Sequence, residues 1–409
     1  MQHLQMQLYK EKKNMNKFKY LIATLGGFQF GYAIGIMSGA ILFIATQFSL
    51  SPEQQGLAVS AFLMGALPGT GITGPLANWM GRKKTQQFMA LLFLIGTFIV
   101  ITSTALPQIM IGRIIQGLAA GGFSVVGPMY LAEVCPAASR GFYIGCYQLA
   151  VTLGIFVAYG VNWALSTEGS WQWMFALGAI PALTHLIGFF FMPNSEAPHQ
   201  ENQAPWKALW EPGVRNALIL AILINVFQQI TGVNAILYFA PSIFKASGFV
   251  TASAALLPAV FLGIINFFMT IFATFLLDRW GRRPLLLAGI TGMIISLLGM
   301  TVAFLSSEAT MKWLATSSIM IFIASFAIGL GPTPQLLGTE LFPRRVRGQA
   351  ISIAGMSNWI FNFIVVFTFM DLTTKLSHAG TFAVYAAFGV LALFFVWKYI
   401  PETKGRALD

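Results

Sequence analysis

The sequence predicts an all-α membrane protein of about twelve transmembrane helices, arranged as two pseudo-symmetric halves of six helices each. Of its 409 residues, 56% are hydrophobic and only 9% are charged, whereas an ordinary soluble domain is about 25% charged. Apolar segments of about 20 residues, each long enough to cross a hydrocarbon layer ~30 Å thick, recur along nearly the whole chain. Two short motifs of the first half return in the second half in the same order.

Each predicted span is an apolar run bounded by charged or turn-forming residues. Helices are the remaining spanning option, because the alternating ten-residue segments of a transmembrane barrel are absent. We expect six-helix halves at 19–192 and 214–400, joined by a linker at 193–213 that is rich in Pro, Asn and Gln. The spans cover approximately residues 19–46, 55–77, 86–104, 107–131, 141–164, 172–192, 214–247, 253–277, 284–305, 312–337, 346–370 and 378–400.

The basic residues predict which side each loop occupies. With an even number of spans, both tails and every even-to-odd loop share one side of the membrane. Of the 24 lysines and arginines, all fall on that side except Arg113, Lys245, Lys312 and Lys375. By the positive-inside rule, the tails at 1–18 and 401–409 are cytoplasmic. The net charge of +11 therefore reflects membrane topology, and we expect no nucleic-acid partner.

Two charged motifs occur twice. The loop NWMGRKK at 78–84 returns as DRWGRRP at 278–284, an offset of 200 residues. Glu133 precedes Arg140 by seven residues after span four, and Glu340 precedes Arg347 by seven after span ten. Anchoring of loops in the headgroup layer is one interpretation, and the duplication favours another. In this second interpretation, clusters of ion pairs form and break as the two halves rock, and so control access at the cytoplasmic side. The candidate residues are Arg82, Glu133, Arg140, Asp278, Arg282, Glu340 and Arg347.

The stretch QQITGVNAILYF, which begins at Gln228, places three carboxamides inside an apolar run. A carboxamide donates and accepts hydrogen bonds without net charge, so it suits a neutral molecule that carries several hydroxyls and avoids the cost of a charge in the membrane. On a straight helix Gln228 and Asn234 would point about 120° apart, and Thr231 with Gly232 offers a place to unwind beside a cavity. Amide bonding between helices is the alternative, to which we assign Asn225.

Taken together, the motifs resemble those of the sugar porters of the major facilitator superfamily over essentially all the predicted spans. The resemblance implies a carrier that moves a monosaccharide or related polyol by alternating access between two halves. We expect no cofactor and no metal. The matching stretches are GRKK and GRRP in the two short loops, GRIIQG at Gly112, PMYLAEVCPAASRG at Pro128, QQITGVNAILYF, GPTP at Gly331, ELFPRRVRG at Glu340, SNWIFNF at Ser357 and PETKG at Pro401.

The resemblance also assigns roles to residues. Tyr238 would help to close the outer gate, and a larger set would contact the sugar, with packing inside the bundle as the alternative for each member. That set is Phe30, Gln148, Gln228, Gln229, Asn234, Asn266, Gln335, Asn358 and Trp359.

The chain departs from the family pattern at four positions. Ala33 stands where members commonly carry aspartate or asparagine, and Asn78 replaces the usual aspartate of the first-half loop, which leaves Asp278 as the intact copy. Gln335 stands where glucose and xylose carriers usually have tryptophan, and Ala327 replaces a glutamate of glucose facilitators. A site that loses an indole and gains an amide is more polar, which argues against glucose itself.

Proton coupling requires a group inside the membrane that gains and loses a proton. None of the thirteen Asp and Glu residues falls mid-membrane. Arg113 does, and in proton-coupled relatives it pairs with the aspartate that Ala33 replaces. His185 in span six fits a packed, hydrogen-bonded role better than that of a proton carrier. We therefore expect facilitated diffusion, with proton symport as the alternative.

Two further functions are disfavoured. A membrane-embedded enzyme would need clustered carboxylates, histidines or an activated nucleophile within the spans, and the sequence offers none. A non-transporting sugar sensor would signal through a tail, and only a few residues follow Thr403. The missing Asn-x-Ser/Thr acceptor and the tiny first outer loop favour a bacterial protein. We thus expect a multi-pass carrier in the bacterial inner (plasma) membrane that functions as a monomer in the lipid bilayer.

Overall fold

The structure is a computed structural model that describes residues 19–135, 140–195 and 206–404. The side chains of Arg140, Trp206, Asp278, Gln335, Thr339 and Arg344 lie outside the description. The described residues form helices and no strands: α2 (Leu25–Gln47), α3 (Pro52–Met80), α4 (Arg82–Ile101), α5 (Leu106–Val134), α6 (Arg140–Ala164), α7 (Trp171–Leu177), α8 (Ala179–Phe190), η1 (Trp206–Trp210), α9 (Pro212–Ile230), α10 (Val233–Ala246), α11 (Ala252–Trp280), α12 (Arg282–Phe304), α13 (Glu308–Ile328), α14 (Thr333–Glu340) and α15 (Arg344–Tyr399).

Several predicted spans are interrupted or joined. Span seven is divided into α9 and α10 at Gly232, where φ is 87°, as the predicted unwinding requires. Span six is divided into α7 and α8 at Gly178, and span ten into α13 and α14. α15 runs through spans eleven and twelve with a kink at Ser377, where φ is 63°. Across these breaks the described residues form twelve crossing segments, and the predicted all-α fold is confirmed.

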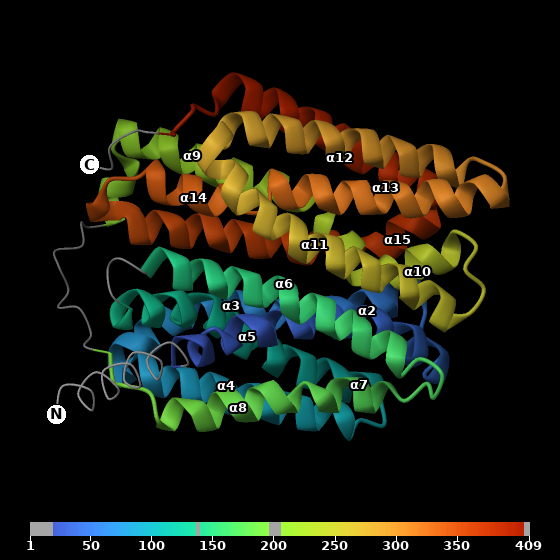
Figure 1. The fold of residues 1–409 in the computed structure, drawn as a ribbon, viewed down its shortest axis with the longest axis horizontal. Coiled ribbons are helices and arrows are strands. Elements are labelled where there is room, and N and C mark those ends of the chain that lie inside the picture. The colour runs from blue at the N-terminus through green and yellow to red at the C-terminus, as the bar shows by residue number, and fades with distance from the viewer. Residues whose placement is uncertain (1–18, 136–139, 196–205, 405–409) are drawn as a thin grey trace, which may run out of the picture.

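The helices lie side by side in two bundles, α2 to α8 in the lower part of Figure 1 and α9 to α15 in the upper part. The bundles meet mainly through three helix pairs, α2 with α10, α3 with α15 and α6 with α11. We call the end that carries the α3–α4 and α11–α12 turns the basic end, and the other the opposite end. The boundaries at 19–192, 193–213 and 214–400 remain predictions, and residues 1–18, 196–205 and 405–409 lie outside the described residues.

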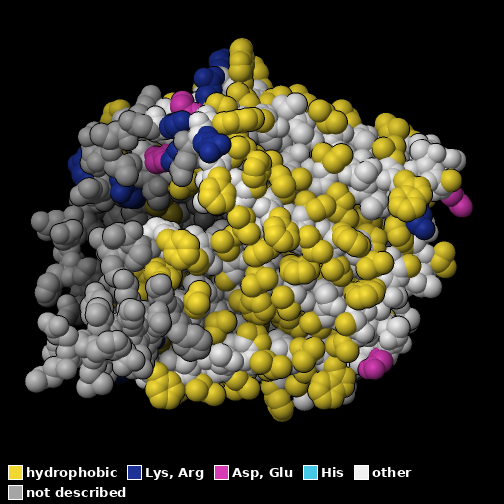
Figure 2. Space-filling model, viewed as in Figure 1, with side chains coloured by type: hydrophobic (Ala, Val, Ile, Leu, Met, Phe, Trp, Pro, Cys, Tyr) yellow, Lys and Arg dark blue, Asp and Glu magenta, His cyan; other side chains and the backbone are white. Residues whose placement is uncertain are grey.

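Aromatic side chains mark both ends of the outer surface. Figure 2 shows hydrophobic side chains over most of the visible face. Trp79 and Trp280 are 82% and 59% exposed near the basic end, and Trp173 and Trp313 are 64% and 70% exposed near the opposite end. Indole rings are enriched where a membrane meets water. The surface therefore has the pattern of a lipid-facing band between two aromatic belts.

Close contact between backbones holds α2 against α6. Gly27, Gly31, Gly35 and Gly39 follow one another at four-residue intervals on α2, so they lie on one helix face. A Cβ added at Gly31 would lie 1.8 Å from the carbonyl oxygen of Val151 on α6. Small residues that let backbones approach are a main source of helix association in lipid, because lipid tails are as apolar as leucine.

Helices α3 and α5 pack reciprocally in the same way. A Cβ added at Gly65 of α3 would lie 1.9 Å from the carbonyl oxygen of Ile114, and one added at Gly117 of α5 would lie 1.8 Å from that of Phe62. Each helix thus presents glycine to the backbone of the other. This packing fixes the position of α5, which carries Arg113.

We predict that Gly31→Ala destabilises the protein, because the added methyl group forces α2 and α6 apart. Overpacking of this kind costs about 1–3 kcal/mol or more, and the midpoint of thermal unfolding in detergent should fall. Gly71→Ala is the matched control, since nothing lies within 4 Å of a Cβ at Gly71 and alanine is the better helix former. Equal unfolding midpoints for the two variants would contradict the proposed role of the contact.

Candidate functional site

Four carboxamides form one hydrogen-bonded cluster, the amide cluster, near the middle of the spans. Asn358 of α15 donates from Nδ2 to Oε1 of Gln228 at 2.6 Å, and Gln229 donates from Nε2 to Oδ1 of Asn358 at 3.0 Å. Asn234 of α10 donates from Nδ2 to Oε1 of Gln229 at 2.7 Å. The fold therefore brings four of the predicted site residues together from three helices.

The break between α9 and α10 allows these amides to meet. At about 100° per residue, Gln229 and Asn234 would point about 140° apart on a straight helix. Gly232 turns the chain between them with its left-handed φ of 87°, a conformation that glycine adopts without a steric penalty. A Cβ there would also lie 2.4 Å from the ring of Tyr385. Both the backbone conformation and the available space therefore require glycine.

Asn225 makes an amide hydrogen bond between helices, as expected from the sequence, and this bond joins it to the amide cluster. Its Oδ1 accepts a hydrogen bond from Nδ2 of Asn358 at 3.2 Å, while its own Nδ2 donates to the carbonyl oxygen of Ala221 at 2.8 Å. The three-residue spacing between Asn225 and Gln228 places both on one helix face. That spacing was the signal that could have assigned Asn225 to the site.

A backbone carbonyl from span ten completes the cluster. Gln228 donates from Nε2 to the carbonyl oxygen of Leu330 at 2.5 Å. This carbonyl is available because α13 ends at Ile328 and α14 begins only at Thr333. Irregular backbone at membrane depth is tolerated where it is buried in protein or lines a cavity. The GPTP stretch marks this break in the sequence, but its partner could not be read from sequence.

The amide cluster is only partly buried. Gln229 is 3% exposed, whereas Gln228, Asn234 and Asn358 are half-buried. Lipid cannot solvate an amide at this depth. The half-buried members of the cluster therefore keep polar surface that a polar molecule can contact.

Aromatic rings from both bundles meet beside the amide cluster. Trp359 lies 5.7 Å from Phe30 between ring centroids, and Phe30 stacks on Phe62 at 6.3 Å. The guanidinium carbon of Arg113 lies 4.7 Å from the centroid of Phe62. A row of rings thus leads from a predicted site residue of the second bundle to the buried arginine of the first.

Two predicted site amides whose side chains are described make no hydrogen bond with the amide cluster. Gln148 is half-buried on α6, and Asn266 is 5% exposed on α11. The side chain of Gln335 lies outside the described residues. Contact of these residues with a substrate remains a prediction.

Arg113 is a fully buried cation, and no acidic side chain pairs with it among the described residues. Its Nη1 donates to Oε1 of Gln116 at 3.0 Å, while Nε and Nη2 have no hydrogen-bond partner in that part of the chain. The rings of Phe62 and Phe175 lie 4.7 and 5.7 Å away, and such contacts offset part of the desolvation cost. Ala33 is buried and supplies no carboxylate.

His185 has the packed environment that the sequence suggested. Its Nδ1 lies 2.6 Å from the amide nitrogen of Gln29. Its ring lies between Phe123 and Phe189, at centroid distances of 5.0 and 4.7 Å. The side chain is fully buried, so it has no open path to the seam.

Ion pairs at the basic end join helices within one bundle. Arg82 donates from Nε to Oε1 of Glu133 at 3.0 Å, and Arg282 donates from Nη2 to Oε1 of Glu340 at 2.7 Å. Asn78, which stands where relatives carry aspartate, accepts from Nη1 of Arg82 at 2.6 Å. The two pairs have equivalent places in the two bundles, which is the symmetry that the repeated motifs predicted.

Glu340 pairs with Arg282 and not with Arg347, the arginine seven residues on. Arg347 donates from Nη2 to the carbonyl oxygen of Phe342 at 3.0 Å, while Glu340 binds Arg282. The reason is geometric, because Arg347 lies near the start of α15 and bonds back to the turn before it. The side chains of Arg140 and Asp278 lie outside the described residues.

The segment after α15 closes over the α11–α12 turn. Glu402 accepts hydrogen bonds from the backbone N–H groups of Arg282 and Arg283, each at 3.1 Å. Thr403 donates to Oε2 of Glu340 at 2.5 Å. Burial raises the pKa of Glu402, but the backbone donors outweigh it and hold that pKa below its usual range. A carboxylate is also favoured at the positive N-terminal end of α12.

Two close contacts between the bundles lie toward the opposite end. Tyr159 of α6 donates to the carbonyl oxygen of Leu237 at 2.6 Å. A Cβ added at Gly56 would lie 2.5 Å from the carbonyl oxygen of Phe367. Tyr238, the predicted outer-gate residue, is fully buried beside these contacts. The seam is therefore closed at the depth of Tyr159 and Tyr238.

Comparisons with known proteins place this geometry in a family. The sequence profile described as "Sugar (and other) transporter" matches residues 19–198 and 196–409. The glucose transporter GlcP of Staphylococcus epidermidis is 36% identical, covering 97% of this chain and 97% of its own. The galactose-proton symporter of Escherichia coli is 33% identical, covering 98% of this chain and 94% of its own.

Solved structures agree with the sequence relatives. The inward-open conformation of the xylose transporter XylE from Escherichia coli matches with a TM-score of 0.83 at 29% identity, covering 95% of this chain and 97% of its own. The chain belongs to the sugar (and other) transporter family, the sugar porters of the major facilitator superfamily, whose members are transporters and not enzymes.

Proposed function

We propose that this sugar porter carries a monosaccharide or related polyol by alternating access, with the amide cluster at the centre of its substrate site. The observation that carries the proposal is the convergence of half-buried neutral amides from α9, α10 and α15 at mid-depth. Carboxamides donate and accept, as sugar hydroxyls do. Phe30, Gln148, Asn266, Gln335 and Trp359 are assigned to the same site by the family resemblance.

The amide cluster suits a weakly held cargo. A substrate hydroxyl must replace bonds that the amides now make with one another, so the net gain per hydrogen bond is only about 0.5–1.5 kcal/mol. A handful of such bonds supports millimolar-scale binding, about −4 kcal/mol. A carrier that must release its cargo needs no tighter binding.

The described state is assigned as inward-facing. The bundles are in contact at the opposite end, whereas the ion pairs at the basic end stay within each bundle. The positive-inside rule makes the basic end cytoplasmic. The two moving bodies are residues 19–192 and 214–400, and the charged residues of the duplicated motifs control access at the basic end.

Observations on coupling point in two directions. Similarity to relatives that are named as proton symporters, such as the galactose-proton symporter, favours proton coupling in this chain. The residues of this chain favour facilitated diffusion, because Ala33 replaces the aspartate of coupled relatives and the buried Arg113 has no described acidic partner. We infer that transport is uncoupled, with proton symport as the second candidate.

We predict that Gln229→Ala raises the half-saturation concentration for uptake about fivefold or more. The variant loses a hydrogen-bonding group worth about 1 kcal/mol, and it leaves Asn234 and Asn358 without their partner. Uptake of radiolabelled sugars and inositols into proteoliposomes measures the effect. Gln108→Ala, which removes a half-buried amide near the opposite end, is the control. Wild-type saturation in Gln229→Ala at normal protein levels would refute the assignment of the site.

We predict that Glu340→Gln shifts the carrier toward the state open at the basic end. Arg282 would keep its charge without a partner, and the added repulsion disfavours closure of the seam there. The accessibility of single cysteines to reagents added from each side measures the shift. Glu211→Gln is the control, because the Glu211–Arg345 pair is exposed at both partners and such pairs contribute about 0–1 kcal/mol. Unchanged accessibility in Glu340→Gln would reject the gating role and favour the alternative, in which these charges only anchor loops at the membrane surface.

We predict that an imposed proton gradient never drives internal sugar above the external level. A neutral sugar that moves alone can only run down its own gradient. Accumulation in proteoliposomes that disappears with a protonophore would show that the second candidate, symport, is correct. Ala33→Asp should introduce such accumulation, because it restores the acid that coupled relatives carry, whereas Ala33→Asn should not.

A further inference from the structure

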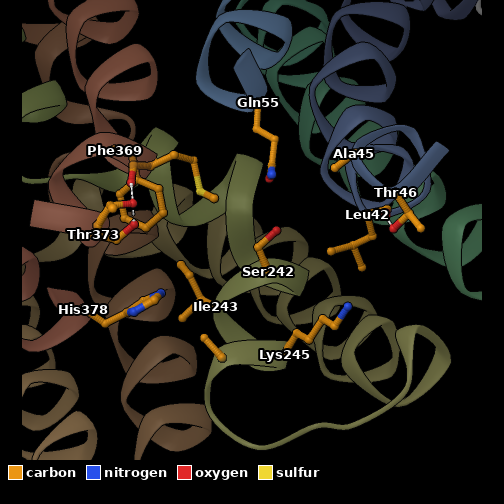
Figure 3. A pocket seen from close by; sticks show the side chains of 13 residues that line it. Leu42, Ala45, Thr46, Gln55, Ser242, Ile243, Lys245, Phe369, Thr373 and His378 are labelled. Atoms are coloured by element: carbon orange, nitrogen blue, oxygen red, sulfur yellow. Dashed lines mark hydrogen bonds between the residues drawn. The ribbon is translucent and has the colours of Figure 1, made fainter. Parts of the chain in front are cut away.

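A cavity lies at the opposite end of the seam, separate from the amide cluster. Its volume is about 520 Å³, within the range of about 300–1,000 Å³ that is typical of small-molecule sites. Figure 3 shows its walls, which come from α2 and α3 of the first bundle and from α10 and α15 of the second. We call it the outer vestibule.

Polar groups from both bundles converge in the outer vestibule. Gln55 of α3 and Ser242 of α10 point toward one another (Figure 3). Gln55 donates from Nε2 to the carbonyl oxygen of Leu50 at 3.1 Å, so its Oε1 is left to accept. The hydroxyls of Thr46 and Thr374 each donate to a carbonyl of their own helix at 2.9 Å. Their oxygens can therefore accept hydrogen bonds from a ligand.

The donors and acceptors of the outer vestibule are mixed, and no carboxylate lines it. Lys245 supplies an ammonium donor and takes part in none of the described ion pairs. Ser242 supplies a hydroxyl that both donates and accepts. A ligand with several hydroxyls matches this arrangement better than a cation, which would meet Lys245, or an apolar molecule, which would leave the polar groups unpaired.

The floor of the outer vestibule is apolar and closed. Phe369 lines the cavity and stacks on Phe239 at a centroid distance of 5.1 Å. Both rings are buried, and Tyr238, the neighbour of Phe239, is fully buried. A molecule that enters from the opposite end therefore reaches these rings and not the amide cluster.

We propose that the outer vestibule is a second carbohydrate site, which takes a neutral disaccharide from the outer side of the membrane. Because its walls come from both bundles, the site is complete only while the seam is closed at that end. A bound sugar then stabilises this state over the state open to the outside, since a ligand shifts an equilibrium by its differential affinity. The proposal rests on the assigned orientation and on the carrier function.

Protection of a single cysteine tests this site without relying on transport. Ser242→Cys is placed in a variant whose two native cysteines are replaced, and it is labelled with a membrane-impermeant maleimide from the outer side. Maltose, sucrose and lactose serve as probes. At least one of them should slow labelling severalfold. Ser306→Cys, on the exposed loop after α12 at the same end, is the control and should be labelled at an unchanged rate.

Two further variants identify the source of the protection. Lys245→Gln should raise the half-protecting concentration about fivefold, because a donor of the cavity is weakened, whereas Lys312→Gln, which lies outside it, should not. Protection should persist in Gln229→Ala, which disables only the amide cluster. The proposal is overturned by no protection from any of the three sugars, by equal protection at Ser306→Cys, or by loss of protection in Gln229→Ala. Protection by glucuronate alone would likewise reject a neutral-sugar site.

Discussion

Close approach of helix backbones is the interaction on which the rest of this structure depends. In lipid the hydrophobic effect does not draw helices together, so packing contact must do so. Gly31 lets α2 meet the carbonyl oxygen of Val151, and Gly117 lets α5 meet that of Phe62. These contacts set the depth and rotation of α2 and α5. The positions of Phe30 and Arg113 beside the seam follow from them.

The two bundles share an outer plan but differ inside. Each has an arginine at the start of its third span paired with a glutamate at the end of its fourth. The first bundle faces the seam with aromatic rings and a buried cation. The second faces it with amides and with the backbone carbonyl of Leu330, which the break between α13 and α14 leaves without a helical partner. A polar cargo would therefore bind chiefly to one bundle and be enclosed by the other. Such a division lets one rigid body hold the cargo while the second moves.

Local features of the sequence predicted much of the fold and part of the site. The span count followed from apolar length, and the break at Gly232 followed from a glycine beside polar residues in an apolar run. The hydrogen-bond partners of the amides were harder to predict, because the carbonyl of Leu330 is available to Gln228 only through an interruption of span ten. Glu340 bonds to Arg282, 58 residues away, and not to the arginine seven residues on. Spacing along a chain carries no information about partners on other helices.

Glu402 bonds to the backbone of Arg282 across 120 residues of chain. The ribosome makes residues in order, so the α11–α12 turn is synthesised long before its carboxylate exists. In the first bundle Lys83 binds the carbonyl oxygen of Met192, 109 residues later, and that residue still precedes α9. The first bundle can thus be completed before the second is begun. In the second bundle, the backbone N–H groups of the α11–α12 turn have no carboxylate partner until synthesis has passed residue 402. Until then, the environment of the nascent chain must stabilise this turn.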